Sequence, residues 1–423
     1  MFKTLRNAWK IPDLRNKMLY TLLMIFIFRL GTFIPVPGLK SGALQSLLGD
    51  GNNLFSLLDA FSGGAFANAT IFAMSITPYI NSSIIMQLLT VAIPALEKLS
   101  KEGEEGRKVI AKWTRFGTVI LAFIQATGLF FALRSALTNS GVWGYITIVS
   151  TFTAGTAFLM WLGEQITEKG VGNGISMIIF AGIVSRIPSA IAGLFANLQA
   201  GSLTIWHLIA IVVLLLLMVA FVVFIDNAER RVPVQYAKRM VGRKMYGGQN
   251  THIPIKVAMA GVIPIIFAMS IMTFPSTIMG FMGYTPSATT FWGKFWRLFT
   301  NTSWLYMLLY FLLIIFFTYF YTAIQFNPIE IANNMKRNGG FVPGIRPGKP
   351  TSDYINKILT RTTLAGAIFI GIVAVLPMIL GIILQTNIAI GGTSLLIVVG
   401  VALETVKQIE SQMLMRHYKG FLE

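Results

Sequence analysis

The sequence predicts an all-α polytopic membrane protein, and three observations support this fold class. Hydrophobic residues make up 55% of the 423 residues. Charged residues make up only 12%, whereas a soluble domain carries about 25%. The charges also gather in clusters, and the apolar runs between the clusters are about 20 residues long, which is the length that an α-helix needs to cross a bilayer.

Ten apolar runs are candidates for transmembrane helices. The clearest is 204–225, which contains no Asp, Glu, Lys or Arg residue, and the least regular is the last, which is interrupted by Gly391 and Gly392. The ten expected spans cover residues 18–36, 70–94, 113–133, 142–163, 175–198, 204–225, 257–280, 304–326, 362–384 and 390–406.

Lysine and arginine residues indicate the orientation, because cytoplasmic loops carry an excess of both. If the N-terminus is cytoplasmic and the spans alternate, 28 of the 34 Lys and Arg residues fall in cytoplasmic segments. No shift by one span gives a comparable bias. We therefore expect both termini in the cytoplasm, and each basic loop is interpreted first as a topology signal.

The chain offers few residues for covalent chemistry. It has no cysteine, and its three histidines lie in different segments without metal-ligand spacing, at His207, His252 and His417. Ion-coupled transporters place ionisable groups near the bilayer midplane, but the carboxylates here lie at span ends or in loops. Arg29 is the exception, and its place near the outer end of the first span indicates snorkelling. We expect no enzyme and no metal site, while a facilitator of polar solutes stays open as an alternative.

Residues 53–66 form a short apolar segment before the second span. Five apolar residues lie on one face of a helix that is too short to cross a bilayer: Leu54, Phe55, Leu57, Leu58 and Phe61. Gly63 and Gly64 then interrupt the helix. A half-helix of this kind lies either at the membrane interface or in a cavity within the protein, and the pattern alone favours the interface.

The second span combines apolar and polar residues. Ile76 and Ile80 are four residues apart and therefore share one helix face. Polar side chains inside a membrane must meet other helices, water or a passing substrate. Hydrogen bonds between helices and a water-filled path with an apolar constriction both agree with this pattern. The polar residues on the neighbouring faces are Asn81, Ser82, Ser83 and Gln87.

Several long motifs resemble those of one known family. They are FRLGTFIPVPG (28–38), FSGGAFANATIFAMSITPYINSSIIMQLLT (61–90), KEGEEGRK (101–108), WLGEQITEKGVGNGIS (161–176), MAGVIPIIF (259–267), FNPIEIANNMKRNGGFVPGIRPGKPT (326–351) and GGTSLLIVVG (391–400). In this order, from the first expected span to the last, they closely resemble the SecY family, the channel subunits of the bacterial protein translocase. The family's ten spans and two cytoplasmic termini agree with the count and orientation above.

The resemblance implies two pseudo-symmetric halves of five spans, residues 1–200 and 201–423, which form a clamshell around an hourglass pore. It implies a protein-conducting channel that performs no enzyme reaction. Unfolded secretory polypeptides would cross the cytoplasmic membrane through the pore, and apolar segments would leave sideways into lipid. The alternatives are a small-solute channel and an intramembrane enzyme. The long basic loops and the half-helix count against the first, and the lack of catalytic groups counts against the second.

The resemblance also assigns roles to residues along the pore. The pore narrows at a ring of aliphatic side chains, which matches Ile76, Ile80, Ile175, Ile179, Ile266 and Ile397. The family's plug fills the outer funnel at rest, and it matches the segment near 53–66 with Leu54, Phe55, Leu57, Leu58, Phe61, Gly63 and Gly64. The lateral gate, which opens toward lipid, matches Asn81, Gln87, Gln125, Ser270 and Thr273.

Two basic loops, residues 226–256 and 327–361, are longer than topology requires. In the family such loops dock the SecA ATPase or the ribosome, and basic side chains suit acidic protein surfaces and RNA phosphates. The resemblance further implies the partner subunits SecE and SecG and no cofactor. Because no nucleotide-binding motif is present, a partner must supply the energy. The matching docking positions are Lys238, Arg239, Arg243, Lys244 and Arg346.

Overall fold

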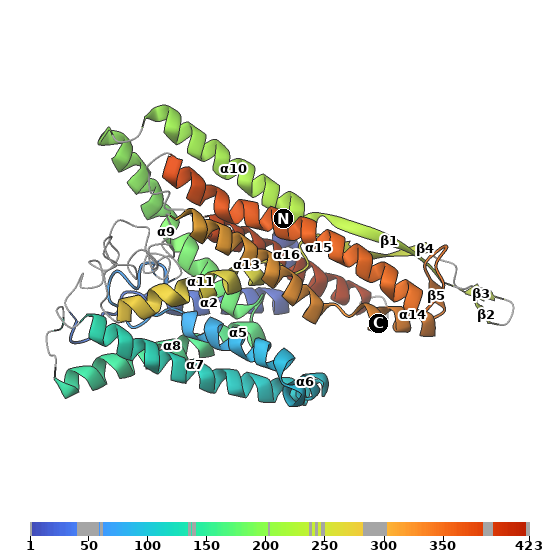
Figure 1. Ribbon diagram of the computed structural model, residues 1–423, viewed down its shortest axis with the longest axis horizontal. Coiled ribbons are helices and arrows are strands. Elements are labelled where there is room, and N and C mark those ends of the chain that lie inside the picture. Colours follow the sequence, from blue (N-terminus) through green and yellow to red (C-terminus); the bar gives the residue numbers. More distant parts are fainter. Residues whose placement is uncertain are drawn as a thin grey trace.

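The chain folds as a set of long helices with a small sheet at one end (Figure 1). The structure, a computed structural model, describes residues 2–39, 59, 62–133, 137, 141–201, 204–236, 239–241, 244–246, 250–281, 303–383 and 392–419. The strands project from the helices at one end of the molecule.

Among the described residues, seven helices come from the first half of the chain. They are α1 (Phe2–Trp9), α2 (Pro12–Gly31), α5 (Thr77–Ala92), α6 (Pro94–Lys101), α7 (Glu104–Ala132), α8 (Val142–Lys169) and α9 (Gly174–Gln199). Helix α8 contacts α2, α5, α7 and α9, and therefore lies at the centre of this group.

The described part of the second half of the chain contains six helices. They are α10 (Ile205–Asn227), α11 (Ile263–Phe281), α13 (Trp304–Gln325), α14 (Pro328–Arg337), α15 (Lys349–Ile383) and α16 (Gly392–Lys419). The two groups meet where α16 contacts α1 and α9 and where α11 contacts α5 and α7. The pseudo-symmetry of the two halves stays a prediction.

The helices have the lengths that a multi-pass membrane protein needs. Within the described residues, seven helices are each long and apolar enough to cross a membrane, and the bent pair α5 and α6 would make an eighth. Each of the ten expected spans overlaps one described helix; α2 and α11, which overlap the first and seventh spans, complete the set. The all-α polytopic fold class is thus confirmed, while the number of ten crossings stays a prediction.

The second expected span differs from its prediction at both ends. Helix α5 begins at Thr77 rather than at residue 70, because residues 63–76 form turns in which Ala69 and Ser75 have positive φ angles of 50° and 52°. An α-helix of L-residues excludes this left-handed conformation. At the other end, Pro94 holds the preceding residue in an extended conformation. As a result, α6 is bent by 102° from α5.

The two basic loops form structure that was not predicted. Strand β1 (Glu229–Tyr236) pairs antiparallel with β4 (Asn250–Lys256) and with β5 (Gly340–Phe341), so that the sheet has the order β4-β1-β5. A second antiparallel pair joins β2 (Arg239–Val241) to β3 (Lys244–Tyr246). One face of the larger sheet packs on α14 and α15 through a core of Val232, Val234, Ile255, Met335, Val342, Ile355 and Leu359. The two loops therefore form one folded unit rather than two independent arms.

Exposed tryptophans lie at the N-terminal ends of three helices. Trp143 of α8, Trp206 of α10 and Trp304 of α13 are 78%, 76% and 71% exposed. Tryptophan concentrates at the membrane–water interface, where its ring is partly apolar and its N–H meets water. The three positions agree with one membrane edge, at the helix ends that the expected topology places on the outer side.

Candidate functional site

The six predicted ring residues belong to one hydrophobic cluster, which is built from both helix groups. Ile80, Ile179 and Ile397 come from α5, α9 and α16, and each is at most 7% exposed. Ile76 caps the start of α5 and is also buried, whereas Ile175 and Ile266 are partly buried. The structure thus brings together side chains that are more than 300 positions apart in the sequence.

A cavity of about 320 Å³ borders this cluster. Ile179, Ile266 and Ile397 lie in its wall, next to the turn at 258–262 that precedes α11. The same cavity reaches four charged residues at the expected cytoplasmic ends of their helices and strand, which are Asp226, Lys256, Glu404 and Lys407. The Lys407 Nζ and Asp226 Oδ2 atoms are 2.5 Å apart and link α16 to α10. The cavity is therefore apolar at the isoleucines and charged toward the cytoplasm.

The cavity wall described above lacks Ile76, Ile80 and Ile175, of which Ile175 packs against α8. The Cδ1 atom of Ile175 lies over Gly163 of α8, where a Cβ on that glycine would come within 2.6 Å of it. That all six residues form one ring stays a prediction.

The turn before α9 is held firmly enough to place the helix start beside the cavity. The Asn173 side chain caps α9 by accepting hydrogen bonds from the N–H groups of Ile175 and Ser176, at 3.1 and 3.2 Å. Thr167 Oγ1 accepts from the N–H of Gly174 at 2.9 Å. A Cβ on Gly174 would lie 1.8 Å from the carbonyl oxygen of Gly163, so only glycine allows α8 and α9 to approach this closely.

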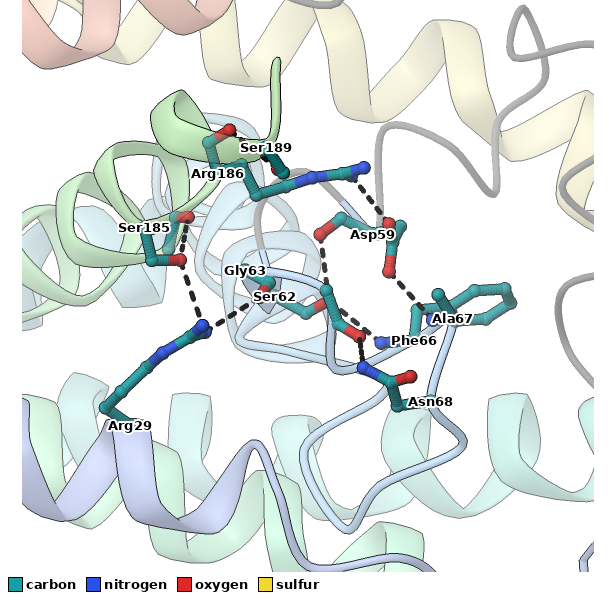
Figure 2. A network of polar contacts seen from close by, with 12 residues as sticks. Arg29, Asp59, Ser62, Gly63, Phe66, Ala67, Asn68, Ser185, Arg186 and Ser189 are labelled. Atoms are coloured by element: carbon teal, nitrogen blue, oxygen red, sulfur yellow. Dashed lines mark hydrogen bonds and ion pairs between the residues drawn. The ribbon is translucent and has the colours of Figure 1, made fainter. Parts of the chain in front are cut away.

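The C-terminal part of the predicted half-helix is anchored by two arginines (Figure 2). Arg29 Nη1 of α2 donates to the carbonyl of Gly63 at 2.8 Å and to Ser185 Oγ of α9 at 3.3 Å. Arg186 Nη1 of α9 pairs with Asp59 Oδ2 at 2.6 Å. These contacts correct the interpretation of Arg29 as a snorkelling residue, because its side chain reaches toward another part of the protein rather than toward the interface.

Only part of the predicted plug can be placed. Gly63 and Gly64 belong to the described residues, and both have positive φ angles, of 68° and 90°. These angles show why a helix cannot continue here and why glycine occupies both positions. The five apolar plug positions, Leu54, Phe55, Leu57, Leu58 and Phe61, lie outside the described residues.

The predicted lateral gate lies where α11 contacts α5 and α7. Gln87 Nε2 donates to Ser83 Oγ within α5 at 3.3 Å. Within the described part of the chain, no hydrogen bond joins Asn81, Gln87 and Gln125, although all three are partly buried. Ser270 is also partly buried, and the side chain of Thr273 lies outside the described atoms. The gate assignment stays a prediction.

A different contact joins α5 to α7. Ser82 Oγ is buried and donates to the carbonyl of Thr114 at 2.8 Å. A Cβ on Gly117 would lie 2.5 Å from Ser82 Oγ, so that the two helices approach each other closely at this glycine. Ser82 thus fulfils the expectation of a hydrogen bond between helices.

One predicted docking residue is well placed. Arg346 is exposed, and it lies between Gly344 and Gly348, whose φ angles are +80° and +103°. Thr351 Oγ1 donates to the Arg346 carbonyl at 2.8 Å and fixes the turn. Arg239 and Lys244 lie on β2 and β3, but their side chains are outside the described atoms, as are the whole residues Lys238 and Arg243.

Comparison with known proteins identifies the family. The family model for SecY matches residues 70–406, which is most of the chain. The chain belongs to the SecY family. It is 48% identical over 437 residues to the protein translocase subunit SecY of Halalkalibacterium halodurans, with all of both chains covered.

Solved structures of the SecY and Sec61 channels share the fold. One concerns the SecY plug domain, which is described as stabilising the closed state of the translocation channel and maintaining a membrane seal. It covers 97% of both chains with a TM-score of 0.64 and 16% identity. Another is Sec61 in a canine ribosome–channel complex, with a TM-score of 0.61, 16% identity and the same coverage. At this low sequence identity, the structural similarity establishes only the fold.

The SecY motifs did not reveal the residues that hold the plug segment. Asp59 lies within the predicted half-helix, and Arg186 is one of few basic residues on the expected outer side. An acidic residue in an otherwise apolar half-helix and an arginine where positive charge is scarce were the two available signals. Their pairing depends on the tertiary structure, so neither signal alone was sufficient.

Proposed function

We propose that this chain is the protein-conducting subunit of a translocase in the cytoplasmic membrane. Unfolded secretory polypeptides pass between its two halves, and sufficiently apolar segments leave between α5 and α7 on one side and α11 and α13 on the other. One observation carries the proposal: isoleucines from α9, α11 and α16 line a cavity that is charged at its cytoplasmic end. Apolar walls offer a passing chain no fixed hydrogen bond, and a narrow apolar throat resists wetting and ion flow.

The name of the relative from Halalkalibacterium halodurans, a protein translocase subunit, supports this function. The expected excess of Lys and Arg on one side supports two cytoplasmic termini. A facilitator of small solutes has no use for a folded, basic cytoplasmic unit, and this unit is built from both long loops.

We infer that the cytoplasmic unit docks the partner that drives transport, either the SecA ATPase or the ribosome. The Sec61 neighbour is described in a ribosome–channel complex, which supports the ribosome as a candidate partner of this fold. The resemblance supports SecE and SecG as partner subunits. Arg346 is the strongest docking residue, because two positive-φ glycines and the Thr351 hydrogen bond hold its backbone in a fixed turn.

Reconstituted vesicles test both proposals. Vesicles that contain the chain with SecE and SecG should protect a secretory preprotein from added protease when SecA and ATP are present. Arg346→Glu should lower this transport by about tenfold or more, because it replaces an attractive charge by a repulsive one at the docking surface. Lys112→Glu, an equal change of charge on an exposed part of α7 outside both basic loops, is the matched control and should transport normally.

Two outcomes contradict these proposals in different ways. Vesicles that pass small solutes but protect no preprotein would make the chain a solute channel. Normal SecA-driven transport by Arg346→Glu would leave the channel function intact and remove Arg346 from the docking surface.

A further inference from the structure

The anchored segment around Gly63 is fixed by its own acidic residue. Asp59 Oδ1 accepts from the N–H of Ala67 at 2.7 Å, and its carbonyl accepts from the N–H of Gly64 at 3.0 Å and from Ser62 Oγ at 3.1 Å. The second carboxylate oxygen, Oδ2, pairs with Arg186. One residue therefore both shapes the segment 62–68 and attaches it to α9 (Figure 2).

A second attachment comes from α2. Arg29 donates to the Gly63 carbonyl and to Ser185 Oγ, and its guanidinium lies 4.8 Å from the centre of the Phe33 ring. The position of a Cβ on Gly63 would be 2.6 Å from Ser185 Oγ and 3.2 Å from Arg29 Nη1. Segment 62–68 is therefore in close contact with both helices, and there is no space for a side chain at residue 63.

The two partners of the ion pair have different surroundings. The Asp59 side chain is 3% exposed, whereas that of Arg186 is 39% exposed. A buried carboxylate without its partner is strongly unfavourable, because it keeps the cost of lost hydration without the compensating attraction. Arg186 reaches water whether or not the pair is intact. Breaking the pair therefore moves Asp59 rather than Arg186, and segment 62–68 moves with it.

We propose that the Asp59–Arg186 pair, assisted by Arg29, is a latch that holds segment 62–68 on α2 and α9 and sets how apolar a signal sequence must be to open the channel. This inference rests on the proposed channel function. It assigns Arg186 and Arg29 as positioning residues, since both act through the segment and not on the polypeptide in transit.

Charge substitutions in the reconstituted complex test the latch. Arg186→Gln and Asp59→Asn should raise the resting ion conductance and the transport of a preprotein with a weakened signal sequence, each by about tenfold, the size expected for one charge-assisted hydrogen bond. Arg186→Lys keeps the charge and should stay close to the unchanged protein. The exchange Asp59→Arg with Arg186→Asp should recover part of the closure that either reversal alone loses.

Two matched controls separate the latch from general damage. Arg115→Gln removes an ion pair of similar length between α7 and α8, in which Arg115 Nε is 2.7 Å from Glu164 Oε1. It should leave conductance and signal dependence unchanged. Gly63→Ala should raise the resting ion conductance more than Gly64→Ala. Both glycines have positive φ angles, but only at Gly63 would a new Cβ have neighbours within 4 Å.

The results that overturn the latch differ from those that overturn the channel function. If Arg186→Gln and Asp59→Asn conduct ions and transport like the unchanged protein, the latch is wrong. The latch is also wrong if the exchange variant conducts ions at rest as much as the single charge reversals. If the unchanged protein transports no polypeptide, the channel function fails. In that case the ion conductance of the variants still decides whether the pair holds the segment closed.

Discussion

Replacing Ile179, Ile266 and Ile397 together by serine is expected to raise the resting ion conductance sharply. The three side chains line one cavity at the boundary between the two helix groups. Their removal widens the throat and gives water hydrogen-bonding partners there, so the free-energy barrier to wetting falls. Conductance rises about tenfold for each 1.4 kcal/mol by which this barrier falls. Planar-bilayer recordings of the purified complex measure the change.

The matched control uses isoleucines on the outer surface of the helices. Ile120, Ile209 and Ile372 are 60%, 47% and 45% exposed, and therefore face away from the core. Their replacement by serine removes the same atoms and adds the same hydroxyls, but it should leave the conductance low. Equal conductance in the two triple variants would show that the cavity isoleucines do not form the seal.

A reversible block of transport is the second large effect that we expect. The chain has no cysteine, so Gly63→Cys with Ser185→Cys introduces the only two thiols. A Cβ at residue 63 would lie 2.6 Å from the oxygen of Ser185, which is within the reach of a disulfide. Oxidation should fasten the segment to α9 and lower preprotein transport to background. Reduction should restore it, because the segment must leave α9 before a polypeptide enters.

The neighbouring glycine provides the control for this block. A Cβ at Gly64 has no atom within 4 Å, so Gly64→Cys with Ser185→Cys should form no disulfide and transport normally under oxidation. Full transport by the oxidised Gly63→Cys, Ser185→Cys protein, with the disulfide verified, would contradict a segment that must move.

The helices could be predicted from the sequence because the length of an apolar run and the positions of charged residues are local properties of the chain. Each of the ten expected spans overlaps a helix, and the isoleucines chosen from the SecY resemblance lie in or against one hydrophobic cluster. Helix periodicity also placed Ile76 and Ile80 on one face. These features depend on spacings within a single helix or on long motifs, and both can be read along the chain.

The differences arise where contacts are distant in sequence. Strand β1 pairs with β5, which follows about a hundred residues later in the chain. The sequence of neither basic loop contains a pattern that predicts this pairing. Arg29 looked like an isolated charge near the interface, because its acceptors, Gly63 and Ser185, come from other segments. The turns before Thr77 were included in a span because their composition is apolar, although two positive φ angles exclude a helix there.

Site-specific photo-crosslinking to a stalled preprotein tests the central claim, passage between the cavity isoleucines, most directly. A photoreactive amino acid is placed singly at Ile179, Ile266 or Ile397, and at the exposed α10 residues Leu216 and Phe224 as controls. We predict crosslinks to the preprotein from all three isoleucine positions, only while transport is stalled, and none from the two α10 positions. Crosslinks from Leu216 or Phe224 but not from the isoleucines would contradict a path between the two halves of the molecule.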